Sequence, residues 1–205
     1  NVTTAVADGP YMQGDDIGIT VTFDEAVTVT GVPKLTLETG TADAVVDYTS
    51  TATNKLTFVY TVGAGHVSGD LDAVSLALGG GDGIKDGAGN DANLQLPKGD
   101  QTGALRKNKT IEIDTSTPQV VNVKAPDSNW DGPYMEGDDI EIVVVFSEAV
   151  TVTGTPNLTL ETGTADAVVG YDSGSGTDTL TFEYTVGAGH VSGDLDVLSL
   201  ALGGG

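Results

Sequence analysis

The residues best suited to chemistry are oxygen-bearing side chains spaced as in a calcium-binding loop. Asp127, Asn129 and Asp131 occupy positions 1, 3 and 5 of such a loop, Gly132 occupies position 6 and Asp138 position 12. A hard cation requires six to eight oxygen ligands, and short side chains alternating around a glycine turn can surround one. Position 12 is Asp instead of the longer Glu, and no helical pattern flanks the loop. The spacing predicts a calcium site, with an acidic turn between two strands as the alternative.

A second set of acidic residues belongs to the expected junction between two modules. If the strands alternate up and down, the turn before the first long strand and the end of the closing strand lie at the same pole. Asp15, Asp16 and Asp114 then meet there, and Glu148 approaches from the following module. The sequence therefore predicts a junction calcium site. The alternative is that Asp16 starts a strand on its solvent-exposed face.

Asp86 and Asn90 form a third candidate, within a loop rich in glycine and aspartate (Asp82–Asp91). The glycine and aspartate order of a calcium-binding β-roll is missing, and no ladder of copies follows. A metal site here competes with a tight turn, in which the two side chains bond to nearby backbone groups.

The two histidines, His66 and His190, stand at equivalent places in a repeated segment. Ser68 and Asp70 lie close to His66 in sequence, so a hydrolytic triad is conceivable. A hydrolase also requires an oriented base and an oxyanion hole. Two identical copies of one loop favour a repeated structural role, and we expect no enzymatic activity.

The composition excludes several classes of partner. Thirty acidic residues oppose eight basic ones, for a net charge of −22. Nucleic-acid binding requires basic patches, and anionic membranes repel such a chain. There is no cysteine, which excludes disulfides and thiolate metal sites. No apolar run approaches the ~18 residues of a membrane-spanning helix, so we expect no membrane insertion.

An internal repeat organises the chain. The residues YTVGAGHVSGDLD occur at 60–72 and again at 184–196. Around them, 33 of 41 residues between Asp8 and Tyr48 recur 123 positions later, and 23 of 27 between Lys55 and Gly81 recur 124 positions later. Continuing the first offset back to the N-terminus aligns Asn1 with Lys124. Two copies this similar have the same fold.

The strand pattern predicts the fold class. Ile17, Ile19, Val21 and Phe23 alternate with small polar residues, and short strands follow, separated by turn residues. They are expected at 27–29, 35–37, 45–48, 56–62, 74–78, 94–96 and 110–114, with loops at 49–54 and 79–90. The pattern predicts an all-β protein of two tandem Ig-like antiparallel β-sandwiches: 1–114, a linker at 115–118, and 119–205. We expect the second to be incomplete, because no copy of 82–114 follows it, and a longer array or a neighbouring chain would then complete it.

These residues resemble a known family. The runs GDDIxIxVxF, EAVTVTG, LTLETG, TVGAG and IKDGAGNDA look like the Ig-like repeats of giant bacterial surface proteins, often described as cadherin-like or SwmB-like. The resemblance covers essentially the whole chain. It implies an extracellular adhesin-like protein in which neighbouring modules of one long chain form a spacer, with calcium stiffening the junctions.

The leading hypothesis is thus a non-enzymatic extender rigidified by calcium. A first alternative is a subunit of a filament or surface layer, in which identical chains add strands to one another. A second is a carbohydrate-binding module, with Trp130 and Tyr134 stacking on a sugar.

Overall fold

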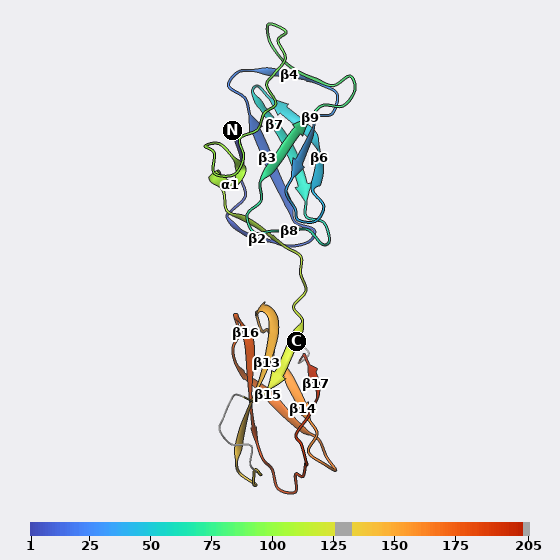
Figure 1. The fold of residues 1–205 in the computed structure, drawn as a ribbon, viewed down its shortest axis with the longest axis vertical. Helices are drawn as coiled ribbons and strands as arrows, with labels where there is room; N and C mark the ends of the chain where they lie inside the picture. Colours follow the sequence, from blue (N-terminus) through green and yellow to red (C-terminus); the bar gives the residue numbers. More distant parts are fainter. Residues whose placement is uncertain (126–132, 203–205) are drawn as a thin grey trace. The chain divides into compact units, whose positions relative to one another are not determined.

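The computed structural model describes residues 1–125 and 133–202. The chain divides into two compact units, Asn1–Ser116 (unit 1) and Thr117–Gly205 (unit 2), with the division inside the predicted linker. The regular secondary structure of both units is almost entirely β-strand, as predicted, and nearly all strand pairs are antiparallel (Figure 1).

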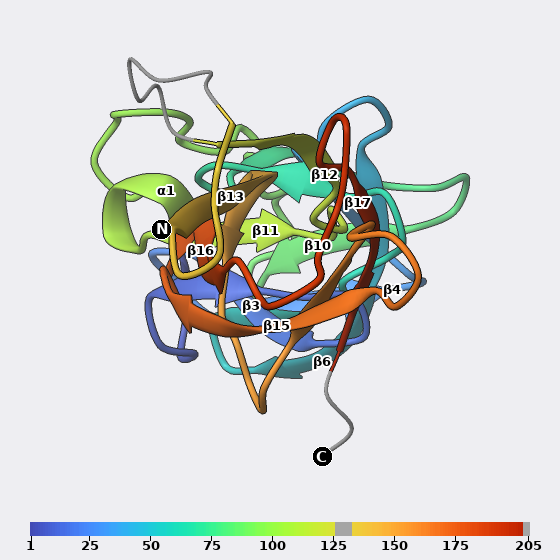
Figure 2. The same ribbon diagram turned by 90° about the horizontal axis from the view of Figure 1, so that it is seen from below.

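Unit 1 contains eleven strands and one helical turn among its residues. They are β1 (Val2–Thr4), β2 (Gly9–Tyr11), β3 (Asp16–Thr22), β4 (Val27–Thr30), β5 (Lys34–Leu37), β6 (Ala44–Ala52), β7 (Lys55–Thr61), β8 (Val67–Ser68), β9 (Ala73–Ala77), β10 (Gly83–Asp86), α1 (Leu105–Asn108) and β11 (Ile111–Asp114). The short α1 lies beside the N-terminus in both views (Figure 1 and Figure 2).

The main sheet of unit 1 has the order β1-β3-β7-β6-β5-β9. Strand β6 belongs to both of its halves, because residues 44–47 pair with β5 and residues 48–52 pair with β7. Two smaller sheets, β10-β4 and β2-β11-β8, complete the unit. The pair β2–β11 is parallel, with Gly9 opposite Ile111 and Tyr11 opposite Ile113.

The core of unit 1 follows from the alternation in its strands. On β3, Ile17, Ile19 and Val21 are buried, and the residues between them are half-buried. Leu56, Phe58 and Tyr60 repeat this on β7. One face of each strand therefore packs into a continuous apolar cluster, which also takes in Leu105 and Ile111.

Unit 2 repeats the main sheet in the order β12-β13-β16-β15-β14-β17. The strands are β12 (Val120–Lys124), β13 (Asp139–Val150), β14 (Asn157–Leu160), β15 (Ala167–Ser173), β16 (Thr177–Thr185) and β17 (Val197–Ala201). Its core contains Ile142, Val144, Leu158, Leu160 and Phe182.

Several expectations for single segments were wrong. The expected loop 49–54 is strand except for the turn at Thr53 and Asn54. The expected loop 79–90 contains β10, which pairs with β4. The expected strand 94–96 is extended chain without ladder pairing, and α1 was not anticipated.

The strand registers also correct the alignment of the two copies. Val2 pairs with Val21, and Val123 pairs with Val144, the counterpart of Val21. Val2 therefore corresponds to Val123, and Asn1 corresponds to Asn122 instead of Lys124. The second copy consequently has two extra residues between this strand and the Asp-Gly-Pro-Tyr run. The predicted calcium loop begins within that longer connection.

Candidate functional site

The thirteen-residue repeat builds a tyrosine–histidine pair in unit 1. The Tyr60 hydroxyl lies 2.8 Å from Nδ1 of His66, and the backbone N–H of Gly63 donates to the same nitrogen at 3.2 Å. The two rings stack with centroids 5.8 Å apart. Burial raises the pKa of Tyr60 to about 12. Because Nδ1 accepts the Gly63 N–H, it is an acceptor for the Tyr60 hydroxyl as well.

Unit 2 repeats this arrangement residue for residue. The Tyr184 hydroxyl lies 2.6 Å from Nδ1 of His190, and the backbone N–H of Gly187 donates to the same nitrogen at 3.2 Å. The two rings stack with centroids 5.9 Å apart. A Cβ added at Gly63 or Gly187 would lie 2.8 Å from Cε1 of the histidine ring. The close approach of the ring explains why glycine stands at this position in both copies.

The nearby serine takes part in a different contact. Ser68 donates to Oε2 of Glu38 at 2.8 Å, and Ser192 donates to Glu161 at the same distance. The other carboxylate oxygen accepts the backbone N–H of Gly40 or Gly163. The hydroxyl proton of Ser68 thus points to Glu38 and Nδ1 of His66 faces Tyr60, so the geometry joins two loops and does not form a triad.

The calcium loop predicted in the second copy lies only partly in the described residues. Asp127, Asn129 and Asp131 lie outside them, so this site stays a prediction. At position 12, Oδ2 of Asp138 accepts the backbone N–H of Met135 at 2.7 Å. In unit 1, Oδ2 of Asp15 accepts the backbone N–H of Met12 in the same way at 2.9 Å. The carboxylate at position 12 therefore closes a turn that both copies share.

The predicted junction residues have contacts within their own units. Asp16 accepts the Thr61 hydroxyl at 2.5 Å, and Asp114 accepts the Ser116 backbone N–H at 2.9 Å. Glu148 lies in β13 of unit 2. Over residues 1–125 and 133–202, no group of three or more Asp, Glu, His or Cys side chains is arranged to hold a metal ion. The junction site also stays a prediction.

Asp86 and Asn90 form the tight turn that was the alternative to a metal site. Oδ1 of Asp86 accepts the backbone N–H groups of Ala88 and Asn90, both at 2.8 Å, and Oδ2 accepts Nδ2 of Asn90 at 2.7 Å. The side-chain bond from Asn90, with the backbone bonds, lowers the pKa of Asp86. Both carboxylate oxygens therefore already have N–H donors.

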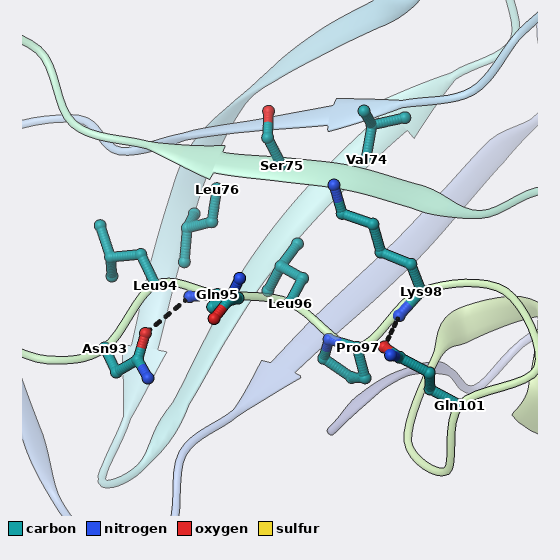
Figure 3. A pocket seen from close by; sticks show the side chains of 10 residues that line it. All are labelled: Val74, Ser75, Leu76, Asn93, Leu94, Gln95, Leu96, Pro97, Lys98 and Gln101. Atoms are coloured by element: carbon teal, nitrogen blue, oxygen red, sulfur yellow. Dashed lines mark hydrogen bonds between the residues drawn. The ribbon is translucent and has the colours of Figure 1, made fainter.

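A groove with a volume of about 1050 Å³ runs beside β9 in unit 1. Figure 3 shows β9 on one side, with Leu76, and the extended segment from Asn93 to Lys98 on the other. Leu96 is buried beneath it. A strand was expected at 94–96 in this segment. Because the segment forms no ladder with β9, an opening lies between the two.

Asp70 is a residue whose environment the sequence did not reveal. Its Oδ1 is buried and has no hydrogen-bond partner in the described part of the chain. Loss of hydration raises the pKa of Asp70, and this effect outweighs a bond from the Ile111 backbone and the attraction of Arg106. Its counterpart Asp194 is exposed. The repeat is identical in letters here, so only packing separates the two carboxylates.

We expect Asp70→Asn to raise the melting temperature of unit 1 by a few degrees at pH 7. Because the folded-state pKa of Asp70 is raised, its ionised form costs stability above that pKa, and the cost disappears as the pH falls below the ordinary value near 3.8. Thermal unfolding at pH 7 measures the gain in melting temperature, and thermal unfolding at pH 3.5 measures its disappearance. Asp194→Asn is the matched control, with no shift expected. An equal gain at both pH values would show that the charge is not the cause.

Comparisons with known proteins give no family assignment: no protein-family model matches the chain, and no curated protein matches it. Within the described ranges, no helix is both long enough and apolar enough to cross a membrane.

Proposed function

We propose that the chain is a non-enzymatic structural protein, built of tandem Ig-like β-sandwich modules. In this proposal it belongs to a large extracellular bacterial surface protein similar to adhesins and acts as a spacer stiffened by calcium. One observation carries the proposal: the tyrosine–histidine pair and the serine–glutamate contact recur in both units with the same partners. The repeated segment makes its contacts inside each module, which is typical of a segment with a structural role in a repeated scaffold.

Calcium enters the proposal through charge and ligand chemistry. A net charge of −22 on 205 residues makes the surface repel itself. Carboxylate and amide oxygens are the ligands that calcium prefers. The residues that would hold it are those of the loop from Asp127 to Asp138 and, at the end of unit 1, Asp15, Asp16 and Asp114. Bound calcium would neutralise these carboxylates and favour one arrangement of the turn.

Calcium should raise the melting temperature of the chain. Extracellular calcium modules typically bind with Kd values of about 10⁻⁴–10⁻³ M. A concentration ten times Kd adds about 1.4 kcal/mol per site to the free energy of unfolding, which is several degrees for a domain of this size. The measurement is thermal unfolding in 5–10 mM calcium (about five to a hundred times Kd), in excess chelator, and in magnesium at equal ionic strength.

Substitutions then locate the metal. Asp127→Ala should remove the calcium-dependent shift of the loop site, and Asp114→Ala that of the junction site. Asp166→Ala, which removes an exposed carboxylate outside both candidates, is the control. If calcium and magnesium give the same small shift, calcium stiffening is wrong. Regular fibres in electron micrographs, in place of dispersed rods, would favour the filament alternative.

A further inference from the structure

The first and last segments of unit 1 run side by side in the same direction. The backbone N–H of Val2 donates to Gly103 at 2.7 Å, and Nδ2 of Asn108 donates to the Val2 carbonyl at 2.7 Å. Further along, Nζ of Lys109 donates to the Val6 carbonyl at 2.8 Å. Gly103 and Asn108 both reach Val2 because helix α1 lies between them, so the two segments advance in step from Val6 and Lys109 onward.

The same parallel contact continues into β2 and β11. Thr110 donates its backbone N–H to Asp8 at 3.1 Å, and Gly9 donates to the Thr110 carbonyl at 3.0 Å. The strand register then matches Gly9 with Ile111 and Tyr11 with Ile113. We call these two segments, residues 1–11 and 103–113, the terminal seam.

The seam joins opposite poles of unit 1. Asn1 bonds to Thr22, at the far end of β3. The other end of the seam lies near the start of β3, where Gly14 bonds to Val62 and Asp15 accepts from Val62. From that pole the chain leaves β11 toward the linker (Figure 1). β11 is also held on its other edge by β8, with Ile113 opposite Ser68.

This geometry decides how a pulling force is distributed. When the two ends of unit 1 are pulled apart, residues 1–11 and 103–113 are drawn past each other along their length. All the bonds of the seam then resist together. A strand pulled from one end instead loses its bonds one at a time. Forced unfolding is governed by the unfolding barrier, so the direction of loading matters even when the equilibrium stability is the same.

We propose that the terminal seam is a force-bearing element, and that unit 1 transmits tension along the chain through it. Tension applied at the two ends of the unit, at Asn1 and at the linker after β11, would load it. The inference concerns unit 1 alone and does not require calcium or an extracellular location. It therefore stands or falls separately from the spacer function proposed above.

Single-molecule pulling on the full 205-residue chain tests the proposal. The sequence contains no cysteine, so two added cysteines are unique attachment points. One pair, a cysteine before Asn1 and Thr117→Cys, draws the seam apart lengthwise. The other pair, Gln13→Cys and Thr117→Cys, peels it from the β3-start pole. We expect the first pair to unfold unit 1 at a force about twofold or more above the second, since several bonds must break together.

Substitutions within the seam connect the force to its bonds. Asp8→Ala with Lys109→Met removes the acceptor of Thr110, the bond to Val6 and a 3.9 Å ion pair, while Met keeps most of the aliphatic stem. Lengthwise pulling should then need less force, and peeling should not change because its first bonds lie near Tyr11 and Ile113. Lys34→Met, which removes the ion pair with Asp47 on β5 and β6, is the matched control.

Two outcomes would overturn the proposal. Equal forces for the two attachment pairs would show that the seam does not determine mechanical resistance. An equal loss of force in both directions in the double variant would assign Asp8 and Lys109 to general stability alone. The length released on unfolding, about 3.3–3.6 Å per residue, reports whether each variant was folded at the start. If the double variant is unfolded, the comparison of directions in the otherwise unchanged chain still decides.

Discussion

Phe58→Ala is expected to lower the free energy of unfolding of unit 1 by about 3–5 kcal/mol. The Phe58 side chain is fully buried in β7 and meets the edge of Tyr48 at 6.4 Å between ring centroids. Its removal leaves a cavity in the apolar cluster of unit 1, beside β3 and β6, the two strands that pair with β7. Domains of this size have about 5–15 kcal/mol of total stability, so the loss is a large fraction.

Phe182→Ala is the equivalent change in unit 2. Phe182 is also fully buried and meets Tyr171 at 6.1 Å. We expect each substitution to shift the transition of its own unit and leave the other unit unchanged. Calorimetry resolves the two transitions, and the transition that each substitution moves identifies its unit. Independent transitions would support modules that each carry their own fold, as a spacer requires. If Phe58→Ala shifts both transitions equally, the units fold as one.

The strands were predictable where side chains alternate, and less so where a partner decides. The residues AVTVTG occur at 26–31 and at 149–154. In unit 1, Val27–Thr30 form β4 because β10 pairs with them. In unit 2, β13 ends at Val150 and the next residues are not strand. The same six residues therefore have two structures, because strand formation depends on the available partner strand more than on the residues themselves.

The sequence predicted which residue types form the candidate sites, and it did not predict the hydrogen bonds that their side chains make. Spacing identified Asp86 and Asp138 as residues with suitable oxygens. It could not show that backbone N–H groups of Ala88, Asn90 and Met135 already bond to them. It also could not reveal the contact of Ser68 with Glu38, thirty positions away. Such contacts depend on which loops the fold brings together, and alternation along a strand carries no information about that.

Gly174→Ala is expected to cost unit 2 about 3 kcal/mol or more, because the change combines a left-handed backbone with a clash. Gly174 has a φ of 111°, and a Cβ there would lie 2.0 Å from the carbonyl oxygen of Thr179. That oxygen belongs to the backbone of β16, so it cannot move without breaking strand pairing. This turn carries the one-residue insertion that distinguishes the two copies, and the extra residue makes a three-residue turn that needs glycine.

Gly176→Ala provides the control within the same turn. Gly176 has a φ of 86°, yet an added Cβ would meet no atom within 4 Å. Its cost should be limited to the left-handed backbone, about 1–2 kcal/mol. Denaturant unfolding followed by circular dichroism measures both costs. Equal costs would mean that the close approach of Gly174 to Thr179 is relieved by a small shift of the turn. A larger cost at Gly174 would show that the turn is rigidly joined to β16. The extra residue of this turn then fits only because Gly174 has no side chain.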